Sequence, residues 1–459
     1  MPGRGPRTRG AAVVAALLAA TVLAACDSSS GSSSGSGPAS GPGTATSSPG
    51  RQEPQKLTFG VIGSPGEINQ YRTMAETYAP ANGEVDVKVE GWPNDAAMLG
   101  AFRDGERVPD VFLASRRHLA YLVQHQLIQP VDSLLDDRDF DFGDEYPRSS
   151  LTAFGNDNRL QCLPYGIQPS VIYYNTRLVR FSRLRNDPPV PGEGWTLEQF
   201  AAAGRWAVRH HPGVAGIYLD PTLSGVTPFV YSGGGQPFDD ATDPTSLAFS
   251  EDTNENTLVQ TVRALRVPGS RLTPEQLAEH TPEEWFARGK LALLQGTRRM
   301  VPDLRRSGVR FDVMPMPSLG TSATVGQLTG LCISSHPRDL TTAADFLVYA
   351  STPGALELVS YAGYLQPANQ TVALSDAFQQ PRQQPRHASV FTFSVKSMEY
   401  PPVVGDSDEL DLAVQPLIQQ MLDGTPQDVP PLARQIDRAS YRVLGPKLGP
   451  TASPSQTAD

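Results

Sequence analysis

Short apolar runs alternate with helical segments through the first part of the globular sequence, and this alternation restricts the fold more than any other feature. The run 57–62 (LTFGVI) is typical of a buried strand and ends at a Gly-Ser-Pro-Gly turn. In 67–78 the apolar residues recur at helical spacing. Two further strand-like runs, 85–89 and 109–113, enclose a helical segment at 96–103. Strands that alternate with helices predict a mostly parallel sheet in an α/β lobe.

The alternation continues towards the C-terminus. About 400 residues follow a low-complexity N-terminal region, and a chain of this length favours two lobes over a single core. Thr196 is expected to cap the N-terminus of a helix at 196–208, and the SGGG segment 232–235 is expected to be a loop. Further strands are predicted at 161–163, 171–174, 216–219, 290–294, 311–314 and 326–334, and further helices at 118–124, 282–288 and 341–350.

The N-terminus has the features of a secretory signal. Three arginines precede an uncharged apolar run at 11–25, which is too short to span a bilayer. The run ends in Leu-Ala-Ala-Cys, which resembles the lipobox of bacterial lipoprotein precursors and implies lipidation of Cys26 after removal of residues 1–25. Cleavage at an ordinary Ala-x-Ala site beside an incidental cysteine is the alternative. Residues 26–55 are nearly all Ser, Gly, Pro, Thr and Ala, so we expect a flexible tether at the extracytoplasmic face of the cell membrane.

Charge and cysteine content restrict the partners. The formal net charge is −10, and −13 without the three arginines of the signal, so we expect no nucleic-acid binding. Besides Cys26, the cysteines are Cys162 and Cys332. A disulfide between them is permitted outside the cytoplasm. Both lie in apolar strand-like segments, however, so buried free thiols are the alternative.

Signals for catalysis and for metal binding are weak throughout the sequence. The motifs of zinc proteases, α/β-hydrolases, P-loop enzymes and dinucleotide-binding enzymes do not occur. The acidic run 136–145 alternates in the manner of a calcium loop, but the twelfth position counted from Asp137 is Arg148 rather than a glutamate. We therefore expect a solvated surface loop there, no catalytic residue, no metal and no cofactor.

Five segments, taken in order, resemble the family of extracellular solute-binding proteins that includes maltose-binding protein. The likeness extends from residue 57 to about residue 448. The segments are LTFGVIGSPGE, VPDVFLASRRHLAYLVQHQLIQPVDSLL, YPRSSLTAFGNDNRLQCLPYGIQPSVIYYNTRLV, FARGKLALLQGTRRMVPDL and TVGQLTGLCISSHPRDLTTAADFLVYASTPGALELVSYAGYLQP.

The resemblance implies a periplasmic-binding-protein-like (type II) α/β fold, with two discontinuous lobes and a ligand cleft that closes about a hinge. The first lobe would comprise 56–164 and 317–372, and the second 165–316 and 373–448, followed by a disordered tail at 449–459. The implied function is capture of a small solute, expected to be a sugar or oligosaccharide, by a monomeric receptor that delivers it to ABC permease subunits. A ligand sensor for a signalling receptor and a secreted carbohydrate-active enzyme are the alternatives.

Candidate ligand-binding residues follow from loops whose counterparts face the ligand in this family. Such loops supply polar groups for hydroxyls and aromatic faces for sugar rings. Trp92 and Tyr364 could instead pack in the core, Gly233 and Gly234 could be simple turn formers, and only one of the arginines at 116 and 117 is expected to reach the cleft. The candidates are Ser64, Glu67, Trp92, Ser115, Arg116, Arg117, Gln168, Ser170, Tyr231, Gly233, Gly234, Thr297, Arg298, Gln327 and Tyr364.

The sequence departs from the family pattern in one respect that bears on the ligand. Many sugar-binding members carry tryptophan two residues after the glycine that corresponds to Gly296, where this chain has Arg298. The opening loop also lacks the frequent tryptophan. Because arginine suits carboxylates and phosphates as well as hydroxyls, an anionic sugar or a non-sugar solute remains open at this point, as does a surface position for Arg298.

Overall fold

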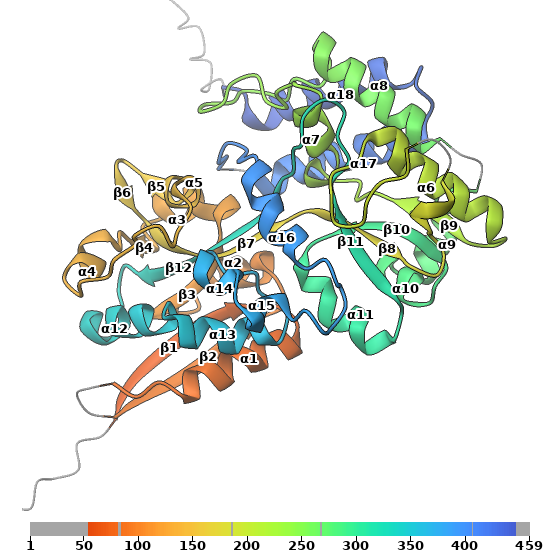
Figure 1. Ribbon diagram of the computed structural model, residues 1–459. Helices are drawn as coiled ribbons and strands as arrows, with labels where there is room; N and C mark the ends of the chain where they lie inside the picture. The colour runs from red at the N-terminus through yellow and green to blue at the C-terminus, as the bar shows by residue number, and fades with distance from the viewer. Residues whose placement is uncertain (1–53, 81–83, 185–186, 267–268, 406, 447–459) are drawn as a thin grey trace, which may run out of the picture. The chain divides into compact units, whose positions relative to one another are not determined.

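The computed structural model describes residues 54–80, 84–184, 187–266, 269–405 and 407–446, and its strands form two separate larger sheets (Figure 1). In the first sheet, β1 pairs in parallel with β2 and β3, while β12 is antiparallel to β3, β4 and β7. Its strands are β1 (Gln55–Ile62), β2 (Val85–Trp92), β3 (Val111–Ser115), β4 (Ile128–Gln129), β7 (Cys162–Pro169) and β12 (Gly326–Ser334).

The second sheet has the order β11-β8-β10-β9, in which β8 is antiparallel to both of its neighbours and β10 is parallel to β9. A short hairpin lies outside both sheets. The strands of the second sheet are β8 (Val171–Asn175), β9 (Ala215–Tyr218), β10 (Leu291–Gly296) and β11 (Phe311–Pro315), and those of the hairpin are β5 (Gly155–Asn156) and β6 (Arg159–Leu160).

The helices begin where the sequence supplies caps. Ser64 caps α1 by accepting from the Glu67 amide. The predicted cap at Thr196 is confirmed and forms a capping box with Gln199. The helices are α1 (Pro65–Glu76), α2 (Asp95–Arg103), α3 (Leu119–Gln124), α4 (Asp132–Asp136), α5 (Arg148–Ala153), α6 (Leu197–His210), α7 (Leu223–Ser232), α8 (Asp252–Leu265), α9 (Pro274–Glu279), α10 (Pro282–Ala287), α11 (Val301–Ser307), α12 (Leu340–Ala350), α13 (Pro353–Tyr361), α14 (Gln370–Ala373), α15 (Asp376–Gln379), α16 (Ser389–Ser394), α17 (Ser407–Asp423) and α18 (Val429–Leu444), with 3-10 turns η1 (Arg116–His118), η2 (Phe181–Arg183), η3 (Arg298–Met300) and η4 (Val395–Ser397).

Each sheet has its own hydrophobic core, and we call the two units the first and second lobes. The first core includes Phe59, Leu331 and Phe346, whereas the second sheet packs between clusters that contain Phe229 and Phe311. In Figure 1 the late strand β12, drawn in teal, lies among the early strands of the first lobe. The lobe boundaries stay a prediction, and several stretches near them pack with the other lobe. Residues 318–321 are hydrogen-bonded to Trp195 and Ser232 of the second lobe, although 317–372 was assigned to the first. Strand β7 continues past residue 164 to Pro169, and Met398 packs in the first core although 373–448 was assigned to the second lobe.

Three of the chain segments that pass between the lobes are hydrogen-bonded to one another. The Ser170 amide donates to Val325 O at 2.8 Å, and Thr324 Oγ1 donates to Ser170 O at 2.8 Å. Thr324 also exchanges backbone hydrogen bonds with Ser397 and Glu399. Because the crossings contact each other, a rotation between the lobes would be concentrated at these few residues.

A disulfide joins Cys162 and Cys332, so the alternative of two free thiols does not hold. The two residues lie opposite each other on the antiparallel strands β7 and β12, and both are fully buried. They are 170 residues apart in sequence. A cross-link that closes so long a loop mainly restricts the unfolded chain, and the loop-entropy relation gives a stabilisation on the order of 5 kcal/mol.

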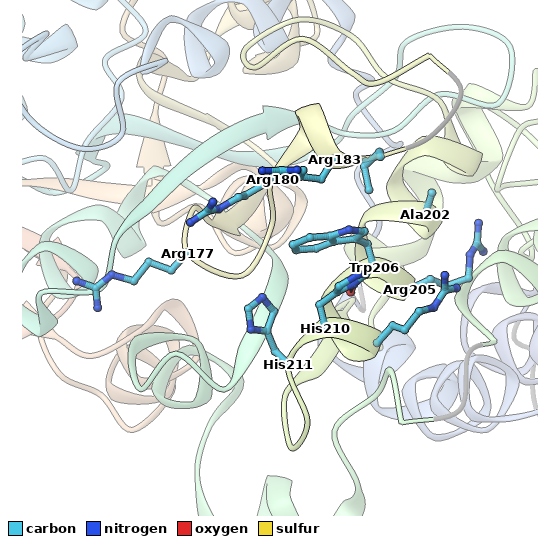
Figure 2. A pocket seen from close by; sticks show the side chains of 10 residues that line it. Arg177, Arg180, Arg183, Ala202, Arg205, Trp206, His210 and His211 are labelled. Carbon is cyan, nitrogen blue, oxygen red and sulfur yellow. Dashed lines mark hydrogen bonds between the residues drawn. The ribbon is translucent and has the colours of Figure 1, made fainter.

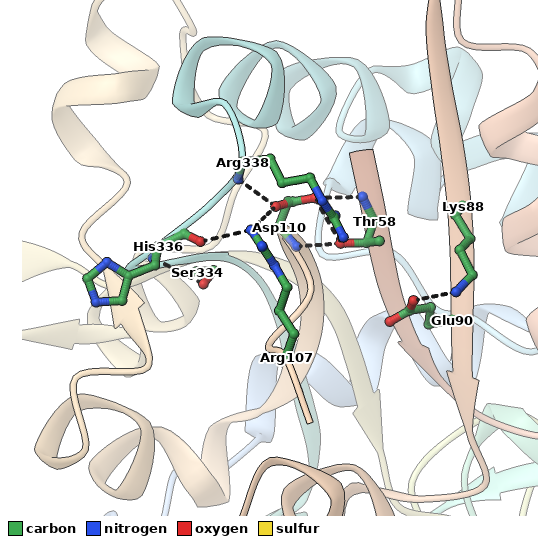
Figure 3. Close-up of polar contacts among 8 residues, drawn as sticks. All are labelled: Thr58, Lys88, Glu90, Arg107, Asp110, Ser334, His336 and Arg338. Carbon is green, nitrogen blue, oxygen red and sulfur yellow. Dashed lines mark hydrogen bonds and ion pairs between the residues drawn. The ribbon is translucent and has the colours of Figure 1, made fainter. Parts of the chain in front are cut away.

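A buried carboxylate holds the amino end of β3 in place (Figure 3). Asp110 is 1% exposed and accepts hydrogen bonds from the amide and hydroxyl of Thr58, both at 2.8 Å, and from the amide and guanidinium of Arg338 at 2.7 and 2.6 Å. Burial disfavours the ionised form, but the hydrogen bonds from Arg338 and Thr58 outweigh it and lower the pKa of Asp110. The cluster therefore ties β1, β3 and the segment after β12 together at the end of the sheet opposite Ser115.

Candidate functional site

Two cavities have walls from both lobes, and the side chain of Arg299 lines both of them. The larger, which we call the Tyr364 cavity, has a volume of about 480 Å³. The smaller, the Gln327 cavity, has a volume of about 230 Å³. The first lobe supplies Gly63, Ser64, Glu67, Pro93 and Tyr364 to the Tyr364 cavity, and the second lobe supplies Thr281, Glu283, Glu284, Ala287, Arg299, Met300, Asp303 and Leu304.

The Gln327 cavity is lined by the carboxyl end of β3, by the start of β12 and by helices of the second lobe. Its polar lining residues include Asp95, Ser115, Arg116, Arg117, Gln327 and Thr329 from the first lobe and Ser224, Thr227, Arg299 and Asp411 from the second. The two cavities together form a cleft between the lobes.

An ion pair between Arg299 and Glu67 crosses this cleft. Arg299 donates to Glu67 Oε1 at 3.1 Å and to Ile62 O at 3.4 Å. Burial raises the pKa of the Glu67 carboxyl, and the Arg299 guanidinium opposes that rise. The same attraction keeps the pKa of Arg299 above its ordinary value despite burial. The pair places a fixed cation and a fixed acceptor side by side at the junction of the two cavities.

Arg116 and Arg117 both line the Gln327 cavity, so the expectation that only one of them reaches the cleft is wrong. Arg116 donates to Ala153 O at 2.9 Å and to Pro401 O at 2.6 Å. Arg117 pairs with Asp408 at 3.0 Å and with Asp411 at 2.8 Å. Both guanidiniums therefore already have protein partners, because η1 directs one towards the carbonyls and the other towards α17.

Five of the remaining candidates line a cavity. Ser64, Glu67 and Tyr364 line the Tyr364 cavity, and Gln327 lines the cavity that bears its name. Ser115 also reaches the second cavity, where its amide donates to Asp95 at 3.1 Å. Tyr364 is 5% exposed, and its hydroxyl accepts from Arg306 at 3.1 Å. Tyr364 is thus nearly buried at the edge of the cavity that it lines.

Other candidates lie close to the cleft without lining either cavity. Gln168 is buried opposite Gln327 in the strand register, with Oε1 unpaired within the described part of the chain, and Ser170 is buried in the crossing. Trp92 packs edge-on against Phe102 at 5.9 Å and faces the first core. These positions fit the core-packing alternative for Trp92 better than ligand contact.

The candidates at the end of α7 and before η3 also line neither cavity. They are Tyr231, Gly233, Gly234 and Thr297. Burial raises the pKa of Tyr231, on α7, to about 12. Gly233 caps α7, and Gly234 has φ 83°, so both act as turn formers. A Cβ on Gly233 would overlap the Thr257 side chain, which explains the glycine without a ligand. Thr297 precedes η3, and its carbonyl accepts from the Tyr173 hydroxyl at 2.7 Å.

Arg298 is the clearest departure from expectation. Its side chain is fully buried in the second lobe, where it donates to Phe378 O at 2.9 Å and lies over the rings of Phe378 and Phe391. Burial lowers its pKa to about 10. The tight turn η3 sends successive side chains in different directions, so Arg298 enters the core while Arg299 enters the cleft. Arg299 is thus the residue that sequence reasoning missed, although the paired arginines marked the position.

Helices of the second lobe supply further cleft residues that the sequence patterns did not identify. They come from α7, α10, α11 and α17, where helical spacing predicts a face but not what the face borders. The missed residues include Glu283, Glu284, Asp303, Thr227 and Asp411. Among the described residues, no group of three or more His, Cys, Asp or Glu side chains is arranged to hold a metal ion. The described helices also include none with the length and apolar character needed to cross a bilayer.

Two α/β lobes, linked by crossing segments and separated by a cleft lined with polar residues, define the class of two-lobe solute-binding proteins. Residues 73–385 match the family of bacterial extracellular solute-binding proteins. The chain belongs to this family, and its place of action is therefore outside the cytoplasm.

Solved structures share the fold at low sequence identity. An ABC substrate-binding protein from Listeria monocytogenes, in complex with cycloalternan, has a TM-score of 0.72 and 18% identity over 86% of this chain and 100% of its own. The GacH receptor of Streptomyces glaucescens, solved unliganded and with acarbose, has a TM-score of 0.69 and 17% identity. The match covers 85% of this chain and 98% of that receptor. The maltotriose-binding protein of Thermus thermophilus, solved with maltotriose, has a TM-score of 0.67 and 17% identity. The match covers 85% of this chain and 100% of that protein.

Proposed function

We propose that this protein is the lipid-anchored receptor of an ABC importer and that it captures an uncharged sugar or oligosaccharide in the cleft between its lobes. The observation that carries the proposal is the charge balance of the cleft. Glu67, Glu283, Glu284 and Asp303 line the Tyr364 cavity, where Arg299 is the cation among the described lining residues. An anion would meet a surplus of carboxylates there, whereas hydroxyl groups can donate to them.

The Gln327 cavity supports the same choice of ligand. Its guanidiniums are engaged by carboxylates and carbonyls of the protein, so an anionic ligand would have to displace existing partners. Gln327, Ser224 and Thr227 offer neutral donors and acceptors beside the apolar surface of Phe238. Neutral hydrogen-bonding groups next to an aromatic face suit a sugar ring. The ligands of the three structural relatives, cycloalternan, acarbose and maltotriose, agree with this assignment.

The mechanism we infer is reversible binding with closure about the crossings. Ser170, Thr324 and Ser397 lie where the three crossings are hydrogen-bonded, so rotation there changes the width of the cleft while each lobe keeps its own core. Contacts across the cleft, such as Arg299 with Glu67 and Arg117 with Asp411, stabilise the closed arrangement. Ligand hydroxyls that bridge the two walls would add to these contacts, and the closed receptor would then be recognised by the permease.

The lipid anchor is the part of this proposal that rests on sequence alone. Cys26 and residues 1–25 lie outside the described residues. Expression of Cys26→Ala in a bacterial host should abolish incorporation of labelled fatty acid and release the protein from the membrane fraction, while Ser28→Ala should leave both unchanged. If Cys26→Ala incorporated as much labelled fatty acid as Ser28→Ala, the proposed lipid anchor at Cys26 would be wrong.

A thermal-shift screen of the full chain against neutral sugars, sugar acids and amino acids tests the ligand class. A ligand that binds only the folded state raises the free energy of unfolding by about 2.7 kcal/mol when its concentration is a hundredfold above Kd. We expect stabilisation by neutral oligosaccharides, and binding restricted to anionic compounds would contradict the proposal.

Tyr364→Ala should then weaken binding of the best neutral ligand by about tenfold, because this aromatic residue lines the Tyr364 cavity. Tyr361→Ala is the matched control, since Tyr361 is 65% exposed and lines neither cavity. Titration calorimetry on the two variants measures the difference. Unchanged affinity in Tyr364→Ala would place the ligand elsewhere.

A further inference from the structure

A cavity lined by several arginines lies away from the cleft, at the C-terminal half of α6 (Figure 2). We call it the α6 pocket. It has a volume of about 770 Å³ and is lined by five arginines. Arg177, Arg180 and Arg183 come from the segment that contains η2, and Arg205 and Arg209 lie one turn apart on α6.

The arginines of the α6 pocket have no carboxylate among the described residues that line it. Asp187 and Glu198, which are close in sequence, are not among the lining residues. The ion pairs formed within the described part of the chain also involve other arginines. The C-terminus of α6 favours positive charge through the helix dipole, but that effect is worth about 1 kcal/mol at most for an exposed residue and does not explain five guanidiniums around one cavity.

The floor of the α6 pocket is aromatic and ordered by its own contacts. The Trp206 and His210 rings stack at a centroid distance of 4.3 Å, and the His211 ring meets Trp206 at 5.8 Å. His210 Nδ1 lies 2.8 Å from Trp206 O. The buried Nε2 of His211 has no hydrogen-bond partner among the described residues. The ring contacts hold the aromatic side chains of the pocket in fixed positions.

The chemistry of the lining selects phosphate groups. Each guanidinium carries five N–H donors in a planar fork, and a phosphate group offers more acceptor oxygens and more negative charge than a carboxylate. Figure 2 shows Arg177 and Arg205 at opposite sides of the pocket, with Trp206 and His211 between them. Five arginines without a carboxylate among the described lining residues carry more positive charge than one phosphate group can balance, so the lining favours an anion with several phosphates.

We propose that the α6 pocket binds an anion that carries two or more phosphate groups. Two sources share this chemistry outside the cytoplasm: a soluble oligophosphate and the headgroups of anionic phospholipids. The site is independent of the cleft, because no residue that lines it lines either cleft cavity.

Binding of tripolyphosphate to the full chain, measured by titration calorimetry at low salt, tests the soluble source. Co-sedimentation with phosphatidylglycerol vesicles, with phosphatidylcholine vesicles as control, tests the lipid source. The variants R205Q/R209Q and R177Q/R180Q remove two charges from either side of the pocket. The matched control R263Q/R288Q removes two exposed arginines of the same lobe that do not line the pocket.

We expect each pocket pair to weaken binding by about tenfold or more, and the control pair by about twofold or less. Loss with tripolyphosphate identifies a soluble anion, and loss with phosphatidylglycerol vesicles identifies the headgroup. Thermal unfolding of each variant verifies that it folds. Three outcomes overturn the proposal: no binding of either probe, equal loss in the control pair, or equally strong binding of a short oligoglutamate.

Discussion

The cleft between the lobes and the α6 pocket both contain arginines, but they use them in opposite ways. In the cleft, Arg299 is paired with Glu67 and Arg117 is paired with Asp408 and Asp411. The α6 pocket is lined by five arginines and by no carboxylate among the described residues. The first arrangement is satisfied within the protein, and the second is completed only by an anion from outside.

This difference separates arginines that hold the fold from arginines that are available to a ligand. A buried ion pair is sensitive to the loss of one partner, since the other is left charged and desolvated. An exposed cation without a partner contributes little to stability and can even oppose it where like charges gather. The same side chain is therefore expected to respond to mutation in two distinct ways.

Replacement of one arginine by methionine in each region should give the largest contrast. Arg299→Met leaves the buried carboxylate of Glu67 unpaired and should lower the free energy of unfolding by about 3 kcal/mol near neutral pH. Arg205→Met leaves no described carboxylate of the pocket unpaired, so the free energy of unfolding should change by no more than about 0.5 kcal/mol. Urea unfolding monitored by circular dichroism measures both, and equal losses would contradict the distinction.

The effect of Arg299→Met should also depend on pH. Burial already raises the pKa of Glu67, and loss of the opposing guanidinium raises it further above the unfolded value of about 4.3. A carboxyl with a raised folded-state pKa destabilises the fold fully above that pKa, and the penalty declines below it until it vanishes below the unfolded value. The stability deficit of the variant should therefore shrink on acidification towards about pH 4.3, by at most about 1.4 kcal/mol per pH unit. A deficit that grows on acidification would refute this account.

Salt should separate binding at the two sites. An increase from roughly 50 to 300 mM sodium chloride should weaken binding at the α6 pocket by about tenfold, because its charges are exposed and screened. Binding of a neutral oligosaccharide in the cleft should change by less than about twofold, and it should be equally unaffected by R205Q/R209Q. Titration calorimetry at both salt concentrations provides the comparison. If the sugar affinity fell with salt as much as the phosphate affinity, the two ligands would share one site and the distinction would be wrong.

The fold was largely accessible from the sequence, because the strand and helix periods, the cap at Thr196 and the order of the family-like segments all agree. Helix α8 was missed, as was the 10-residue helix α7. Its sequence, LSGVTPFVYS, contains Gly, Pro, Thr and Val, which are poor helix formers, and tertiary burial overrides their local preference. The segment 232–235 accordingly enters the loop one residue later than predicted, after Ser232. The state of Cys162 and Cys332 was also undecided until β7 and β12 were seen to be neighbours.

The residues of the site were harder to predict from the sequence than the fold, because their positions depend on three-dimensional geometry. Loops after β1 and β3 could be assigned to the cleft because parallel strands end at one edge of their sheet, and Ser64, Glu67, Ser115, Arg116 and Arg117 line its cavities. The choice between adjacent arginines at η3 depends on a turn whose direction no periodicity fixes. The carboxylates of α10 and α11 lie across the cleft from the first lobe, and no short-range pattern connects them to it.

The position of β12 has a consequence for the order in which the chain can fold. This strand pairs with β3, β4 and β7, yet it begins at Gly326, after the second sheet has been completed by β11. A ribosome therefore releases every strand of the second sheet before the first lobe can close its own, and the second lobe in turn waits for α17 and α18. Neither lobe can therefore be completed until its late segments, β12 or α17 and α18, have been synthesised.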